Sequence, residues 1–114
     1  MILEKGEKVF IISRRLFEKD LRRHFIGEVE EATERVARVK GFAFVYDDNA
    51  VKFIKREDIR IRLFSLTDAA NIINILPIET IVADISYQTN EKHQRIITDG
   101  KHFEMNVSEF SFHL

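Results

Sequence analysis

Short segments rich in β-branched and aromatic residues recur along the chain, and they predict a mainly β protein. Turn residues separate the predicted strands, which cover residues 7–13, 25–33, 36–46, 60–66, 71–76, 95–98 and 101–107. Asp99-Gly100 lies between the last two strands, and an Asp-Gly pair supplies the positive φ angles of a tight hairpin turn. Residues 79–87 fit a helix as well as a strand. The pattern therefore predicts antiparallel strands that end in a C-terminal hairpin.

One segment has a different periodicity. Leu16, Phe17, Leu21 and Phe25 recur at helical spacing, and charged side chains occupy the positions between them. No strong capping residue precedes the segment, so the sequence does not define where the helix would begin. The spacing predicts a short helix over residues 16–25.

The long predicted strand 36–46 has two contrasting faces. One face carries small and aliphatic residues, and the other carries Arg38, Lys40, Phe42, Phe44 and Tyr46. Gly41 in mid-strand predicts a bulge or a sharp coil of the strand, either of which would turn both Val39 and Phe42 inward. Exposed aromatic rings would stack on bases while the cations hold phosphate. The alternative is that the rings lie in the core and only the cations reach water.

A turn at residues 47–49 follows this strand. Asp47 and Asn49 are candidate ligand-binding residues there, and the alternative is that they only shape the turn. Together with the stripe at 38–46, they form the candidate nucleic-acid-binding set. A second basic group is a candidate for phosphate contacts, unless acidic residues 28–34 neutralise it: Arg14, Arg15, Arg22 and Arg23.

Composition narrows the class of protein. A chain of 114 residues suggests one domain with a core that needs neither disulfides nor metal. The 18 Lys and Arg residues nearly balance 19 Asp and Glu residues, so the whole molecule has no strong net field. No apolar run approaches the roughly 20 residues of a membrane span. We therefore expect a cytoplasmic protein with no membrane partner.

Residues that carry catalysis or bind metals are sparse. With no Cys, thiol catalysis and Cys-ligated metals are excluded, and the four His residues lack metal-ligand spacing. The Ser residues lie outside any Gly-x-Ser-x-Gly elbow, and four scattered glycines make no phosphate loop. The sequence therefore predicts no enzyme, no catalytic residue, no metal and no cofactor.

Residues 40–47, Lys-Gly-Phe-Ala-Phe-Val-Tyr-Asp, resemble the longer ribonucleoprotein signature of RNA-recognition-motif domains. Residues 9–11 resemble the partner motif on the first strand of such domains. This resemblance implies an α+β, ferredoxin-like sandwich with aromatic side chains on an open sheet. It also requires a second helix within residues 48–59.

A second resemblance covers residues 7–77 in order and is preferred because it leaves fewer elements missing. Residues 25–29 are similar to the bent second strand of Sm-like proteins, residues 42–49 to their third strand with its Asp-Asn loop, and residues 63–77 to their closing strand–turn–strand. This resemblance implies a small, strongly bent five-stranded barrel that assembles into rings. In Sm-like proteins the Asp/Asn loop works with an Arg-Gly loop, and this chain has Thr67-Asp68 there instead.

We therefore expect a single structural domain, with an Sm-like barrel at residues 1–77 and a C-terminal hairpin extension, 78–114, packed on it. Its expected role is non-enzymatic. The resemblance implies an oligomeric ring that binds RNA, and the apolar runs at 59–64 and 72–76 favour pairing between copies. The alternative is a protein-interaction or assembly module without a nucleic-acid role, for an unknown protein partner. Strand or turn at residues 48–59 favours the barrel, and helix there favours the α+β sandwich.

Overall fold

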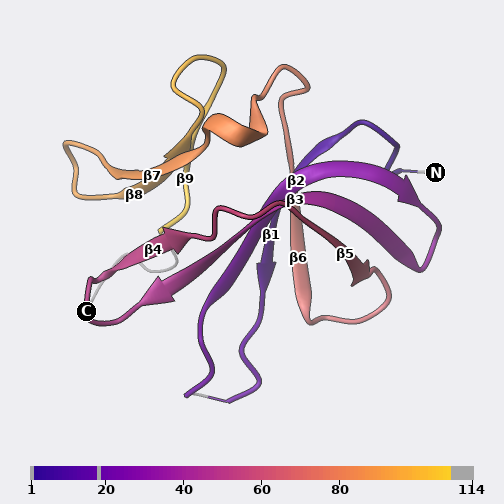
Figure 1. The fold of residues 1–114 in the computed structure, drawn as a ribbon, viewed down its shortest axis with the longest axis horizontal. Coiled ribbons are helices and arrows are strands. Elements are labelled where there is room, and N and C mark those ends of the chain that lie inside the picture. The colour runs from indigo at the N-terminus through magenta and orange to yellow at the C-terminus, as the bar shows by residue number, and fades with distance from the viewer. Residues whose placement is uncertain (1, 18, 109–114) are drawn as a thin grey trace.

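The computed structural model describes residues 2–17 and 19–108, which form two antiparallel sheets (Figure 1). The larger sheet contains β1 (Lys8–Ser13), β2 (Arg23–Ala32), β3 (Val36–Asp47), β4 (Lys52–Lys55), β5 (Arg60–Ser65) and β6 (Asn71–Leu76). A 3-10 turn, Val82–Asp84, precedes the smaller sheet of β7 (Ser86–Thr89), β8 (Arg95–Thr98) and β9 (Glu104–Asn106). The expected mainly β fold class is confirmed.

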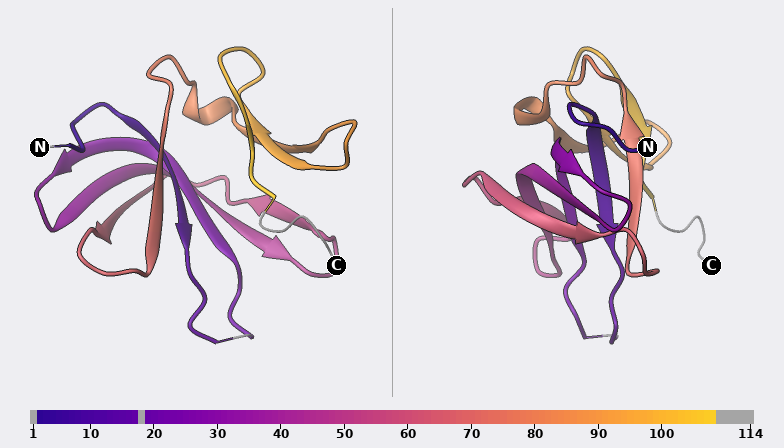
Figure 2. Two further views of the ribbon diagram at one scale, coloured as in Figure 1. Left: turned by 180° about the vertical axis from the view of Figure 1, so that it is seen from behind. Right: turned by 90° about the vertical axis from the view of Figure 1, so that its right-hand side faces the viewer.

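The larger sheet runs in the order β6-β1-β2-β3, and two strands share the far edge of β3. β5 pairs with residues 36–41 of β3, and β4 pairs with residues 44–47. β5 and β6 are joined by residues 66–70, yet they do not pair with each other within the described residues. The sheet is thus curled but open on this side (Figure 2), and the expectation of a closed barrel is wrong for the part of the chain described here.

Two arginines lie on the inner face of the curled sheet beside this opening. Arg60 and Arg62 alternate along β5 and share a face with the buried Phe64. A closed barrel of this size fills its interior with packed side chains, where unpaired guanidinium groups would lose their hydration. The open side leaves water within reach of both groups, and the Arg60 side chain is 39% exposed.

Strand alternation divides the core into two layers. The layer on the inner face of the larger sheet contains Val9, Ile11, Phe25, Val29, Ala37, Val39, Ala43 and Phe64. The layer between the outer face and the smaller sheet contains Phe10, Ile26, Phe42, Phe44, Phe53, Leu76, Ile85, Ile97 and Val107. Successive residues of β1, β2 and β3 enter opposite layers because neighbouring side chains point to opposite faces of a strand.

Gly41 has a different role from the predicted one. It lies directly opposite Gly27, and the β2–β3 register continues through this pair without a shift. A Cβ atom on either glycine would meet the backbone of the facing strand, so both positions serve a close approach of two strands. The bulge falls instead between Val29 and Glu31 on β2.

The short helix predicted at residues 16–25 is also wrong for the described residues of that range; Glu18 lies outside them. Residues 23–25 belong to β2, where they pair with both β1 and β3. Leu16 and Phe17 are exposed, so no surface covers an apolar helical face. The Asp20 carboxylate accepts their backbone N–H groups at 3.2 and 3.1 Å, which forms a compact loop instead. Strand pairing outweighs the local periodicity here.

The C-terminal part forms a three-stranded sheet, not a hairpin alone. Residues 79–87 resolve into the 3-10 turn followed by β7. β8 and β9 pair as expected, but their loop spans residues 99–103 because Thr98 is opposite Glu104. Residues 109–114 of the expected extension lie outside the described residues. The segment 48–59 contains a turn and β4, and no α-helix occurs among the described residues, so the α+β alternative does not hold.

Candidate anion-binding site

The predicted aromatic stripe of β3 is divided between core and surface. Phe42 and Phe44 are only 8% and 2% exposed, because the smaller sheet covers them. The Phe44 ring centroid is 5.1 Å from that of Tyr87 on β7. Lys55 places its ammonium 4.2 Å from the centroid of Phe42. Neither phenylalanine therefore presents a free ring face for stacking on a base.

The polar members of the predicted set lie in three separate places. Arg38 is exposed and its Nη1 is 3.3 Å from Glu31 Oε1. Lys40 lines a groove together with Glu28, Glu30 and the largely buried Phe42. The Asp47 Oδ1 atom accepts the backbone N–H of Asn49 at 2.9 Å, as a turn-shaping residue does. The fold does not bring the seven predicted residues together into one site.

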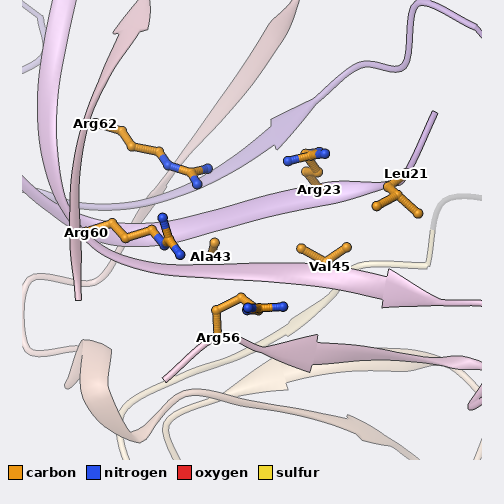
Figure 3. A pocket seen from close by; sticks show the side chains of 7 residues that line it. All are labelled: Leu21, Arg23, Ala43, Val45, Arg56, Arg60 and Arg62. Carbon is orange, nitrogen blue, oxygen red and sulfur yellow. The ribbon is translucent and has the colours of Figure 1, made fainter. Parts of the chain in front are cut away.

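A cleft rich in arginine lies on the inner face of the larger sheet (Figure 3). It has a volume of about 320 Å³ and is lined by Leu21, Arg23, Ala43, Val45, Arg56, Arg60 and Arg62. Its lining includes no carboxylate from the described residues. We call it the arginine cleft.

Three strands, β2, β3 and β5, and the residue that follows β4 contribute to the arginine cleft. Arg23 begins β2 directly opposite Val45 of β3. Arg60 and Arg62 lie opposite Gly41 and Val39 on the other edge of β3. Arg56 follows β4, and its backbone N–H donates to the Ala43 carbonyl oxygen at 2.8 Å. The guanidinium groups come toward one space from both edges of β3 (Figure 3).

These cations are only partly compensated. Asp58 pairs with Arg60 at 2.9 Å, and within the described residues Arg23, Arg56 and Arg62 make no ion pair. Partial burial lowers the pKa of Arg62 from its ordinary value, the neighbouring charges of Arg60 and Arg23 lower it further, and the Asp58 carboxylate opposes them only in part. A local field of positive charge therefore exists in a molecule whose formal net charge is −1.

Two features of Arg60 and Arg62 describe the side of the cleft next to the core. The Arg62 guanidinium carbon is 5.5 Å from the ring centroid of the buried Phe25. The Arg60 Nε atom is buried and has no hydrogen-bond partner within the described residues. An unsatisfied buried donor costs about 1–3 kcal/mol. An anion that accepts from this N–H would remove that cost.

A second basic cleft adjoins the first. It has a volume of about 260 Å³ and is lined by Arg15, Lys19, Asp20, Leu21, Arg22, Tyr46 and Asp48, so Leu21 belongs to both clefts. Arg22 and Arg95 place their guanidinium carbons 4.8 and 5.2 Å from the Tyr46 ring centroid. Three members of the basic group noted in the sequence thus line the two clefts: Arg15, Arg22 and Arg23. Tyr46 is the one member of the predicted stripe that joins them.

A buried polar contact connects the two sheets. The buried His24 on β2 has its Nδ1 atom 2.6 Å from the Tyr87 hydroxyl, and its ring stacks on Phe53 with centroids 4.1 Å apart.

In the described part of the chain, no group of three or more acidic, His or Cys side chains is arranged to hold a metal. That same part contains no helix long and apolar enough to cross a membrane.

The sequence contains a weak signal for the arginine cleft. Arg60 and Arg62 alternate with isoleucine and leucine, so their shared face could be predicted from the printed letters. Arg23 and Arg56 are far from them in the chain, and only the pairing of β2, β4 and β5 around β3 brings all four together.

No protein-family model, curated protein or solved structure matches this chain. Its function is therefore argued from the chemistry of the cleft.

Proposed function

We propose that this protein binds single-stranded RNA, with backbone phosphate in the arginine cleft. The observation that carries the proposal is the convergence of four guanidinium groups in a cleft without a lining carboxylate. Guanidinium is planar and donates paired hydrogen bonds that match phosphate oxygens. Its positive charge also releases counterions from a nucleic-acid backbone.

The shape of the site favours a flexible single strand. A concave cleft of about 320 Å³ receives one phosphate with part of its sugar. The phosphates of a duplex lie on a convex, rigid surface and enter such a cleft less readily. The cleft has no aromatic lining residue, so it supplies charge without reading a base.

The role is binding, not catalysis. The arginine cleft is lined by arginine and aliphatic residues, and none of these is a nucleophile or a general base at neutral pH. The aliphatic floor of Ala43 and Val45 gives a reacting group no proton donor or acceptor. The proposal involves no cofactor and no metal.

An Sm-like architecture remains the finer proposal for the fold. Two observations support it: β1 to β6 fall within residues 7–77, and β2 carries Gly27 where it approaches β3 closely. The open edges of β5 and β6 would then meet in a ring of copies.

Self-assembly is a second candidate function, supported by a separate observation. β5 and β6 have unpaired outer edges within the described residues. Several large apolar side chains are exposed there or beside them: Ile59, Ile61, Leu63, Ile72 and Ile75. An exposed apolar edge strand is a template for pairing with another chain. Assembly through these edges needs no nucleic acid.

Filter binding to uridine-rich and random RNA over a salt series tests the proposed RNA binding. We expect the logarithm of the affinity to fall with the logarithm of salt by about 0.7 for each phosphate contacted. Replacing both Arg60 and Arg62 with Gln should make this slope shallower by roughly one to two contacts. The matched control is Arg35→Gln, an exposed cation outside both clefts.

Two results would contradict the proposed RNA binding. One is no retention of either RNA at low salt. The other is an unchanged slope in the Arg60→Gln, Arg62→Gln protein when that protein is folded by circular dichroism. An equal loss in Arg35→Gln would also count against the cleft, because it would show that any surface cation contributes as much.

A further inference from the structure

We infer that the arginine cleft binds the terminal phosphate of an RNA strand, and that the strand leaves the cleft across Leu21 toward the second basic cleft. This inference rests on the proposed RNA binding and narrows it to strands with a phosphomonoester end. Three features carry it: the charge density of the cleft, its packed floor and the second basic cleft beside it.

Charge density favours a terminal phosphate. A phosphodiester inside a chain carries one negative charge, whereas a phosphomonoester carries nearly two above its second pKa of about 6. Four arginines line a space of about 320 Å³, and only Arg60 has a carboxylate partner among the described residues. A dianion with three strong acceptor oxygens compensates this cluster better than a monoanion with two.

Packed core side chains form the floor of the cleft. Ala43 lines the cleft, and the buried Phe25 lies opposite it on β2. Arg62 lies over the Phe25 ring at 5.5 Å, and the buried Arg60 Nε–H donor has no hydrogen-bond partner within the described residues. A terminal phosphate has one ester link, so it can approach this floor with less steric hindrance than a phosphodiester, which continues on both sides.

The second basic cleft lies beside the first and offers a place for the adjoining nucleotides. Leu21 is 49% exposed and lines both clefts, so the two clefts adjoin across its side chain. In the second cleft, Arg15, Lys19 and Arg22 provide positive charge for the backbone of the adjoining nucleotides. Asp20 and Asp48 also line this cleft and reduce its attraction for phosphate. The arginine cleft therefore binds phosphate more strongly than the second cleft does, and it holds the end of the strand.

The experiment compares three RNA strands of one sequence, about ten nucleotides long, which is within the site sizes of single-strand binders. One carries a 5′-phosphate, one a 3′-phosphate and one hydroxyls at both ends. Affinity is measured by fluorescence anisotropy at low salt, with the dye on the end opposite the phosphate. We expect one phosphorylated strand to bind about tenfold or more tightly than the hydroxyl strand, as charge-assisted hydrogen bonds to an added anion predict.

Variants and pH tie this preference to the cleft. Arg60→Gln with Arg62→Gln should remove the preference, and Arg35→Gln should keep it. Arg23→Gln is a second test, because Arg23 is exposed and its loss leaves the core intact. The preference should shrink between about pH 7.5 and about pH 5.5, as the monoester gains a proton near its second pKa of about 6.

The outcomes separate the inference from the proposed function. Equal binding of all three strands, lost in Arg60→Gln with Arg62→Gln, overturns the inference and leaves RNA binding standing. No binding of any strand overturns both. If uridine monophosphate or inorganic phosphate competes as strongly as an equal concentration of the phosphorylated strand, the site takes a small phosphate and the path across Leu21 is wrong.

Discussion

Phe44 illustrates how the two sheets depend on single side chains. Its ring is 2% exposed and contacts Tyr87 of the smaller sheet, while its backbone belongs to β3 of the larger one. Lys40 lies on the same side of β3 yet is exposed, because the smaller sheet does not extend that far. One strand face is thus part core and part surface.

Replacing Phe44 with Ala should lower the free energy of unfolding by about 3–5 kcal/mol, because it removes a buried ring and leaves a cavity. Urea denaturation measures this change. Phe17→Ala is the matched control: Phe17 is 71% exposed, and its loss should change stability by less than about 0.5 kcal/mol. A Phe44→Ala protein with the same free energy of unfolding as wild type would contradict the core position of this ring.

At the scale of elements, Asp99 links the β8–β9 loop to the segment that precedes β7. Its carboxylate accepts the backbone N–H groups of Lys101, His102 and Ile81 at 2.9, 2.7 and 3.1 Å, and the His102 Nδ1 atom lies 2.9 Å away. Burial alone would raise the pKa of Asp99, but these donors outweigh it and hold the pKa well below its ordinary value. The ionised carboxylate is therefore the form that stabilises the fold.

The sign of the pH effect follows from this lowered pKa. Asp99 stabilises the native state fully above its unfolded pKa of about 3.9, and the contribution fades as the pH falls from there toward the lower native pKa. Asp99→Asn should therefore melt at a lower temperature than wild type at neutral pH, and the difference should narrow below about pH 4. Thermal melts across this range test the prediction. Asp48→Asn, in an exposed turn, is the control. A difference independent of pH would contradict the assigned role.

At the scale of the whole molecule, the open side of the larger sheet is the feature that bears on association between copies. β5 and β6 expose apolar side chains and unpaired backbone edges within the described residues. Pairing of one copy's β5 with another copy's β6 would extend the sheet and bury both edges. An open curled sheet thus favours association of copies.

Light scattering after size exclusion should show an oligomer whose population grows with concentration. Ile61→Lys should shift the protein toward monomer, because a charged residue on an exposed edge strand opposes pairing. Ile61 is 58% exposed, so the change should leave the core intact. The control is Ile2→Lys, at a 98% exposed position outside the sheets. A wild-type protein that stays monomeric at high concentration would contradict assembly through these edges.

Most of the strands could be predicted from the letters, and the reasons for the failures are physical. The helix expected at residues 16–25 fails because β2 gains two pairing partners, whereas an isolated helix of that length gains little. The bulge expected at Gly41 fails because a glycine can mark close backbone approach as well as a bulge. In both cases the deciding partner is distant in the chain.

By itself, the sequence determined the β class and which residues share a face of each strand. These are local properties, since alternation follows from the geometry of an extended backbone. Only the tertiary structure decided that Phe42 is covered while Lys40 is not, and that Arg23, Arg56, Arg60 and Arg62 line one cleft. Both outcomes depend on strand order, register and curl, which arise from pairings between residues far apart in the chain and are not encoded in any short stretch of it.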